Sequence, residues 1–189
     1  MRMRTRRETL HRAAGLGAAV LLPSLLRPGA ARAQSTEEED LRDFLEQAIE
    51  VEQDSVLAYG TALESPNIDA AVKGTLELLR DQEQAHANAW RSAIDSLGFE
   101  APDPPGDPAD SEELEGLAEL EKSDELLAFL AEYEQTLLAR YLDLAPPLES
   151  EDLSRTSAEV IASHAQHLVV VRSALGEDPA KVLERVARG

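Results

Sequence analysis

The sequence contains no cysteine among its 189 residues. No disulfide bond can therefore stabilise the fold, which must be held together by side-chain packing. Basic residues are also few, with 18 lysines and arginines against 37 aspartates and glutamates and a net charge of −19. A surface with this charge repels nucleic acids and anionic lipids, so we expect neither to be a partner. We expect most of the carboxylates to form a solvated coat that keeps the protein soluble.

The first 33 residues contain an apolar run that is too short to span a bilayer. This apolar run covers residues 13–26; it follows paired arginines at Arg6 and Arg7 and precedes Ala-Arg-Ala, which ends at Ala33. The arrangement is typical of an export signal over residues 1–33. The Thr-Arg-Arg-x-x-Leu pattern resembles a twin-arginine leader, and the alternative is an ordinary secretory signal. We therefore expect an exported protein, periplasmic or extracellular, without a membrane anchor after cleavage.

Cleavage after Ala33 makes the remaining chain still more acidic. The leader contains seven arginines and one glutamate, so the mature part keeps 11 basic and 36 acidic residues and a net charge of −25. No cysteine follows the cut, so we expect no lipid anchor.

No segment of the mature chain shows the alternation of apolar and polar residues that is typical of a strand, so we expect helices throughout. Ser35 and Thr36 precede an acidic run and predict a helix from about residue 37 to 64. Further helices are predicted from the reversal at 65–67 to about 97, and over about 123–144 and 151–175, with glycines ending the second and the fourth. We also expect a short helical piece within 111–120 and a small terminal helix in the tail, residues 177–189.

The lengths of the connections predict how these four helices are arranged. Two connections are short, which makes their helices antiparallel neighbours. The third covers residues 98–122, is rich in proline and glycine at its start, and is long enough to cross a whole bundle. The sequence therefore predicts an all-α four-helix bundle over residues 34–176, built as two antiparallel helix pairs joined by a long crossover.

The two predicted helix pairs are related by an internal repeat. The segment EVEQDSVLAY (residues 50–59) matches EYEQTLLARY (132–141), and RDQEQAHANAWRSAI (80–94) resembles ASHAQHLVVVRSAL (162–175). The offsets are 82 and 81 residues, so one helix pair is present twice. Repetition alone predicts only a structural two-fold. Within the repeat, Glu83 of the first copy is replaced by His164 in the second.

Polar residues interrupt the apolar face of each predicted helix near its middle. These residues are Glu52 in the first helix, Glu83 and His86 in the second, Glu134 in the third, and His164 and His167 in the fourth. Because the middles of bundle helices lie at one level, we expect the six side chains to converge on one buried place. An unpaired buried carboxylate costs several kcal/mol, and a pair of divalent metal ions would neutralise three of them directly. The alternative is a set of core side chains that satisfy one another by hydrogen bonds.

Three aromatic residues lie on the same core faces. Tyr59 and Tyr141 follow Glu52 and Glu134 by seven residues, which is two helical turns. Each tyrosine is expected either to hydrogen-bond a ligand carboxylate across the bundle, as a second-shell residue, or to be an ordinary core aromatic. Trp90 lies one turn beyond His86, and we interpret it as a packing residue.

On these residues the sequence resembles the ferritin-like superfamily, over about residues 37–175. That family uses one glutamate from each of two helices and Glu-x-x-His from each of the other two, around two iron or manganese ions. The resemblance implies that Glu52 and Glu134 are the single glutamates and that Glu83, His86 and His167 belong to the paired motifs. More narrowly, the chain resembles exported bacterial ferritin-like proteins with a twin-arginine leader.

His164 departs from this family pattern, which has a bridging glutamate at that position. The site is therefore expected to be an asymmetric metal pair, a single metal ion or a degenerate remnant. Three imidazoles favour iron, zinc or copper over manganese. Within the resemblance, iron is the favoured ion, as two ions or one, with manganese or zinc as alternatives.

Three functions are consistent with this sequence. The first is an exported di-iron oxidoreductase of the ferroxidase or peroxidase type, with ferrous iron and dioxygen or peroxide as its partners. The second is a metal-binding or stress-protection protein without turnover. The third is a structural bundle with a degenerate metal site, whose polar core groups are paired with one another.

Overall fold

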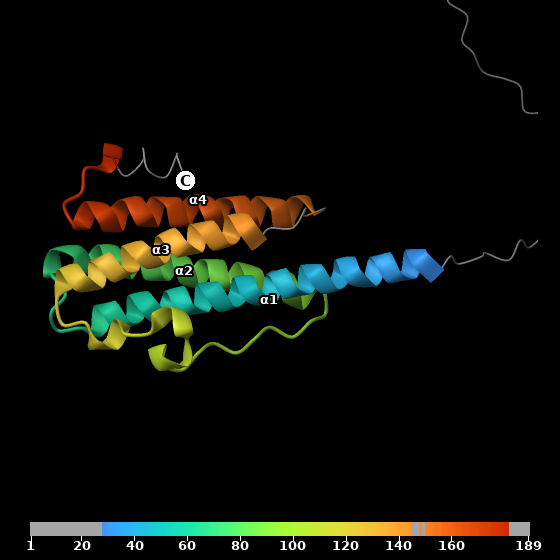
Figure 1. The fold of residues 1–189 in the computed structure, drawn as a ribbon, viewed down its shortest axis with the longest axis horizontal. Coiled ribbons are helices and arrows are strands. Elements are labelled where there is room, and N and C mark those ends of the chain that lie inside the picture. Colours follow the sequence, from blue (N-terminus) through green and yellow to red (C-terminus); the bar gives the residue numbers. More distant parts are fainter. Residues whose placement is uncertain (1–27, 145–147, 149, 182–189) are drawn as a thin grey trace, which may run out of the picture.

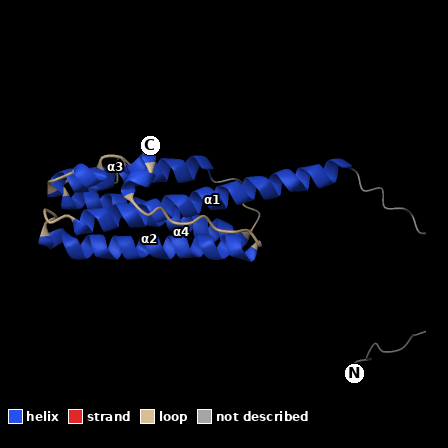
Figure 2. Ribbon diagram, turned by 90° about the horizontal axis from the view of Figure 1, so that it is seen from below, coloured by secondary structure: helices blue, strands red, loops and turns tan. Residues whose placement is uncertain are grey.

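The computed structural model describes residues 28–144, 148 and 150–181. Within this part every regular element is helical (Figure 2), and four long helices lie side by side as a bundle (Figure 1). The helices are α1 (Pro28–Glu64), α2 (Ala70–Ser96), α3 (Ser123–Leu144) and α4 (Glu151–Ala174). The predicted all-α four-helix bundle is confirmed. No helix in the described ranges has an apolar stretch that could cross a membrane.

Two predicted segments lie wholly or largely beyond the described residues. Most of the predicted leader, residues 1–27, is one of them. The end of the predicted terminal helix, residues 182–189, is the other, although residues 179–181 are helical. The leader and its cleavage site stay predictions.

The helix α1 begins at Pro28 rather than near Glu37, where it was predicted to start. Proline is tolerated in the first turn of a helix because its missing N–H would be unpaired there. The alanines at 30, 31 and 33 are strong helix formers and extend the helix through Ser35 and Thr36. In Figure 1 this first part of α1 extends beyond the other three helices.

The helices α2 and α4 end as the sequence predicted, at glycines in the left-handed conformation. Gly98 has φ +79° and Gly176 has φ +81°. This conformation lets the backbone turn back and pair the last carbonyl groups of the helix. At its other end α2 is capped by Asp69, whose carboxylate accepts a hydrogen bond from the backbone N–H of Ala71 at 2.8 Å.

The crossover from α2 to α3 packs along α1 and contains three short 3₁₀ turns, where one helical piece had been predicted over 111–120. The turns are η1 (Pro108–Asp110), η2 (Glu112–Leu114) and η3 (Leu117–Glu119). Gly116, with φ +82°, separates the last two and prevents a continuous helix. Leu114 and Leu117 are both buried and attach the crossover to the bundle core.

The start of the crossover is also held by hydrogen bonds. The backbone carbonyl of Pro102 accepts one from Gln53 Nε2 on α1 at 3.2 Å and one from Arg91 Nη2 on α2 at 3.1 Å. These two bonds fasten the long connection to the first helix pair, on the outside of the bundle.

The core of the bundle is apolar above and below a polar centre. Buried leucine, isoleucine, valine, alanine and aromatic side chains come from all four helices. The inward faces predicted from the spacing of apolar residues are those that the helices bury, and five of their six polar interruptions are buried with them.

Candidate metal centre

The six side chains predicted to converge do meet in the middle of the bundle. They are Glu52 of α1, Glu83 and His86 of α2, Glu134 of α3, and His164 and His167 of α4. Five of them are at most 1% exposed, and His86 is the exception with 16% of its side chain exposed. The three imidazole ring centroids lie between 5.6 and 6.1 Å apart.

Helical spacing explains how two helices each contribute two of these side chains. Glu83 and His86 are three residues apart, as are His164 and His167. Residues at i and i+3 lie on the same helical face, one turn apart, so each pair points into the same space. The two single glutamates complete the set from the two other helices.

The six residues form two overlapping groups of possible metal ligands. Glu52, Glu83, His86 and His164 form one, called here the His86 group. Glu83, Glu134, His164 and His167 form the other, called the His167 group. In each group, one ligand atom from each residue lies within 4.8 Å of all the others. Glu83 and His164 belong to both groups, so the cluster offers two neighbouring metal positions.

The side chains of this cluster also contact one another directly. His167 Nδ1 lies 2.6 Å from Glu83 Oε1, and His164 Nδ1 lies 2.9 Å from Glu134 Oε2. The other nitrogen of the same ring, His164 Nε2, lies 3.2 Å from Glu52 Oε1. His164 therefore spans the centre of the cluster, with one ring nitrogen toward each single glutamate.

These contacts shift the pKa values of the carboxyl groups in two directions. Burial alone would raise the pKa of the Glu134 carboxyl, but hydrogen bonds with His164 and His167 outweigh it and lower the pKa to about 2. Burial acts on Glu52 in the same way, and hydrogen bonds with His164 and His86 lower its pKa well below the usual range. At Glu83 burial prevails, and the pKa is raised.

The imidazoles respond in the opposite sense. Burial would lower the pKa of His86, but hydrogen bonds with Glu52 and Glu83 raise it to about 9. The pKa values of His164 and His167 are raised as well, because hydrogen bonds with buried carboxylates outweigh burial at both. In the metal-free protein these shifts favour the pairing of protonated rings with the Glu52 and Glu134 carboxylates, and a metal ion would compete with protons for the ring nitrogens.

Two tyrosines hold the single glutamates from the opposite helix. Tyr59 of α1 donates a hydrogen bond to Glu134 Oε1 of α3 at 2.5 Å. In the reciprocal arrangement, Tyr141 of α3 donates to Glu52 Oε1 of α1. Both tyrosines are buried, and burial is the main reason that their pKa values are raised well above the usual range, so both remain donors.

Trp90 does more than pack in this structure. It is fully buried and meets Phe44 edge to face, with ring centroids 5.6 Å apart, as a packing residue would. Its Nε1–H also donates to the Tyr141 hydroxyl at 3.1 Å, which extends the hydrogen-bond chain from Glu52. This contact was not predicted from the sequence, where its only signal was the position of Trp90 one turn beyond His86 on the same face.

Two further polar residues, Gln82 and Ser163, contact the cluster and were also missed. Gln82 Oε1 lies 2.7 Å from His167 Nε2, and Ser163 Oγ lies 3.1 Å from the same nitrogen. Each of them directly precedes a residue of the cluster in the sequence, Glu83 and His164 respectively. Their only signal was this adjacency, because neither lies on the inward stripe of its helix.

The donor set of the cluster fits a divalent transition-metal ion. Imidazole nitrogens and carboxylate oxygens together suit iron and zinc, and the carboxylates also suit manganese. The hydrogen bonds from the two tyrosines to the single glutamates are the kind of outer contact that orients ligand carboxylates.

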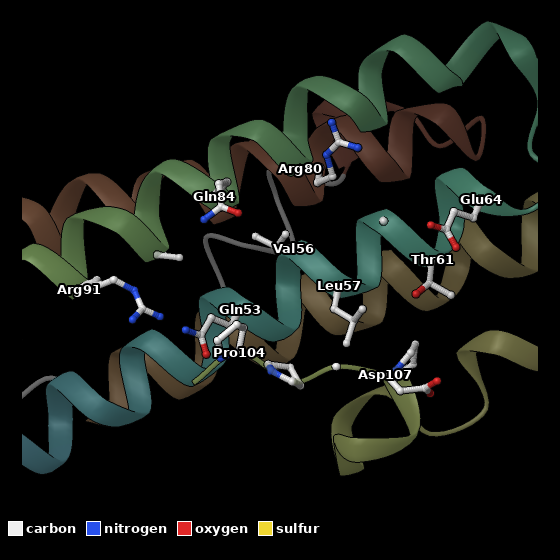
Figure 3. A pocket seen from close by; sticks show the side chains of 15 residues that line it. Gln53, Val56, Leu57, Thr61, Glu64, Arg80, Gln84, Arg91, Pro104 and Asp107 are labelled. Atoms are coloured by element: carbon white, nitrogen blue, oxygen red, sulfur yellow. The ribbon is translucent and has the colours of Figure 1, made fainter. Parts of the chain in front are cut away.

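A groove lies between α1, α2 and the start of the crossover (Figure 3). It has a volume of about 470 Å³ and is closed on one side by the proline-rich start of the crossover, residues 104–108. Gln53, Gln84, Arg80 and Arg91 are among its polar lining residues. None of the six residues of the cluster lines it, so the groove and the candidate metal centre are separate features.

The comparison with protein families agrees with the fold and the cluster. The family model for the ferritin-like domain matches residues 39–177, which includes all four helices of the bundle except the first part of α1. The chain therefore belongs to the ferritin-like family. The further comparisons, with curated proteins and with solved structures, gave no match.

Proposed function

We propose that this protein binds two divalent metal ions, most favourably iron, at the His86 and His167 groups. The observation that carries the proposal is the convergence of three carboxylates and three imidazoles from four helices into two overlapping sets of ligands. Burying so many ionisable groups in one place is expensive unless a positive charge compensates the carboxylates. Metal ions would supply that charge more compactly than protonated imidazoles.

The residues around the cluster support a redox role for bound iron. Iron held there would supply the exchange of electrons with dioxygen or peroxide that ferrous-iron oxidation and peroxide removal require. Glu83 and His164 belong to both groups and would be among the residues that hold the ions. Tyr59 and Tyr141 fix the two single glutamates, and burial of the cluster everywhere except at the His86 edge limits the access of bulk water. The partly exposed edge at His86 is where a small reactant would approach.

His164 supports a second candidate function, which is metal binding without turnover. Its imidazole spans the centre of the cluster where a carboxylate would otherwise lie between the two groups. A neutral ring cannot change its coordination as a carboxylate can when the charge of a metal ion changes. A His164→Glu variant that consumes dioxygen with ferrous iron, beside an inactive parent chain, would favour this second function.

The experiment that tests the proposal is anaerobic reconstitution of the protein with ferrous iron, followed by elemental analysis. We expect the Glu83→Ala variant to lose stoichiometric iron because it removes a ligand from both groups at once. Glu132→Ala is the matched control, since Glu132 lies on a neighbouring helix but is exposed. Oxygen uptake by the loaded protein then separates an oxidoreductase from a binding protein.

Two outcomes would contradict the proposed metal binding. One is unchanged iron content in Glu83→Ala. The other is a parent chain that takes up no metal and melts at the same temperature with and without it, which would favour a structural bundle whose imidazoles and carboxylates neutralise one another.

We also propose that the protein is exported through its twin-arginine leader, residues 1–33. The paired arginines Arg6 and Arg7, the short apolar run and the Ala-Arg-Ala sequence support this. Replacing both arginines by lysine is expected to keep the protein in the cytoplasm with its leader uncut, as cell fractionation and intact mass would show. Undiminished export of that variant would support the ordinary secretory route instead.

A further inference from the structure

The two copies of the repeat differ at two adjacent positions in the candidate metal centre. The first copy has Gln82 followed by Glu83, and the second has Ser163 followed by His164. The second of these differences changes a candidate ligand, as described above. The difference between Gln82 and Ser163 changes a residue that contacts a candidate ligand. Both of these residues contact His167, so they affect the His167 group and not the His86 group.

His167 is held by both of these residues. Its Nδ1 faces Glu83 inside the cluster at 2.6 Å, and its Nε2 lies 2.7 Å from the amide oxygen of Gln82. Since that amide oxygen can only accept, Nε2 carries the hydrogen and donates it. Ser163, one turn earlier on α4, lies 3.1 Å from the same nitrogen. When the ring gives up its second proton to bind a metal ion, Nδ1 is therefore the nitrogen whose lone pair faces the cluster.

His86, the equivalent residue of the first copy, has no such support. Its Nδ1 faces Glu52 at 3.2 Å and Glu83 at 3.3 Å. Its Nε2 has no hydrogen-bond partner among the residues that the structure describes. The side chain is 16% exposed, against 2% for His167. Ser163, which corresponds to Gln82 in the repeat, contacts His167 on its own helix and does not hydrogen-bond Nε2 of His86.

We infer that Gln82 and Ser163 are positioning residues that make the two metal positions unequal, so that the His167 group binds a divalent cation first and more tightly than the His86 group. This inference rests on the proposed metal-binding function. A histidine ligand whose second nitrogen is hydrogen-bonded has a fixed tautomer and ring orientation, and removal of such a partner typically lowers metal affinity by about 10–100-fold. The His167 group has this support, and the His86 group lacks it.

The shared ligands increase the difference. Glu83 and His164 belong to both groups, so the first ion engages them before the second arrives. The second ion must then rely on Glu52 and on the unsupported ring of His86. The two ions therefore bind in sequence rather than as an equal pair.

The test is a titration of the purified full chain with Co²⁺. Calorimetry and the visible absorption bands of the bound ion monitor the binding. We expect two steps, with the tighter one weakened by about 10–100-fold in Gln82→Leu and the weaker one unchanged. Gln82→Glu keeps an acceptor for Nε2–H and is expected to keep the tight step. Gln84→Leu is the matched control, since Gln84 is on the same helix and hydrogen-bonds only Asn88.

A second variant tests the same inference by gain of binding. Ser163→Gln places in α4 the residue that α2 has at the equivalent position, where it can reach His86. We expect the weaker step to become tighter in this variant, whereas the tighter step, which loses the Ser163 contact with His167, should not become tighter.

Several results would overturn the inference. Two Co²⁺ ions that bind equally tightly to the parent chain, or a Gln82→Leu variant that weakens both steps alike or neither, would contradict the proposed order. Absence of any Co²⁺ binding by the parent chain would instead remove the metal-binding function itself, and the inference with it.

Discussion

At the scale of single residues, the reciprocal hydrogen bonds of Tyr59 and Tyr141 connect the first helix pair to the second. Each joins α1 to α3 through a buried glutamate of the candidate metal centre. A hydrogen bond to a charged group contributes about 1.5–3 kcal/mol, more than one between neutral groups. The same two bonds therefore serve the stability of the bundle and the orientation of two candidate ligands.

We expect Tyr59→Phe to lower the free energy of unfolding by about 1.5–3 kcal/mol, because it removes a hydrogen bond that Glu134 Oε1 accepts. The affinity for metal should also fall, since Glu134 loses a contact that orients it. Chemical denaturation and Co²⁺ titration measure the two effects. Tyr133→Phe is the control, because this buried hydroxyl contacts only uncharged groups among the described residues, the Val51 backbone carbonyl at 3.4 Å and the Ser55 side chain. Equal losses in the two variants would contradict a special role for Tyr59.

The six candidate ligands could be predicted from the sequence because each breaks an apolar stripe at mid-helix. The hydrogen bonds of Gln82, Ser163 and Trp90 could not be predicted in this way. A stripe reports which residues face inward, but a hydrogen bond between α2 and α4 depends on how the two helices are rotated and shifted against each other. Gln82 is a surface residue whose amide reaches His167 only because of that placement.

At the scale of elements, α2 shows how the same amino acid has opposite effects at two places. Gly74 is inside the helix, and a Cβ built there has no atom within 4 Å. Gly98 follows the helix at φ +79°, a conformation that costs other residues about 1–2 kcal/mol. The first glycine weakens the helix, and the second lets it end.

We expect Gly74→Ala to stabilise the protein by about 0.5–1 kcal/mol, because alanine loses less conformational freedom in a helix than glycine does. Gly98→Ala should destabilise it by about 1–2 kcal/mol through the strained backbone. Thermal and chemical unfolding of the two variants provide the comparison, and each serves as the control for the other. Changes of the same sign would contradict this account of the helix end.

The ends of the elements show where local sequence was sufficient and where it was not. The start and the end of α3, and the glycines that end α2 and α4, were predicted because local signals decide them. The start of α1 was placed too late, because the cap signal at Ser35 and Thr36 was weaker than the helix-forming residues before it. The crossover was predicted as a long connection, but its three turns depend on burial of Leu114 and Leu117 against the bundle.

At the scale of the whole molecule, the centre of the bundle couples folding to pH. The pKa of His86 is raised to about 9, and those of His164 and His167 are raised as well. A group whose pKa is raised by folding stabilises the folded state fully below its unfolded pKa, about 6.5 for histidine. That contribution is lost as the pH rises through the folded value.

We therefore expect the metal-free protein to melt at progressively lower temperature between pH 6.5 and about 9. The affinity for a divalent metal should rise over the same range, because the imidazoles must lose their protons to bind it. Scanning calorimetry of the metal-free protein and Co²⁺ titration in buffers of different ionisation enthalpy measure the two trends. Glu132→Ala should show the same trends as the parent chain, whereas a metal-free melting temperature that is constant across this range would contradict the proposed coupling.

Both halves of the repeat are joined in one polypeptide by the crossover that Gln53 and Arg91 fasten to the first helix pair. In a pair of identical subunits around a two-fold axis, every substitution occurs on both sides of the axis, so the two halves of a shared site must stay alike. Covalent fusion removes that restriction. A substitution in one helix pair of this protein does not alter the other pair. The first copy can therefore have Gln82 and Glu83 where the second copy has Ser163 and His164.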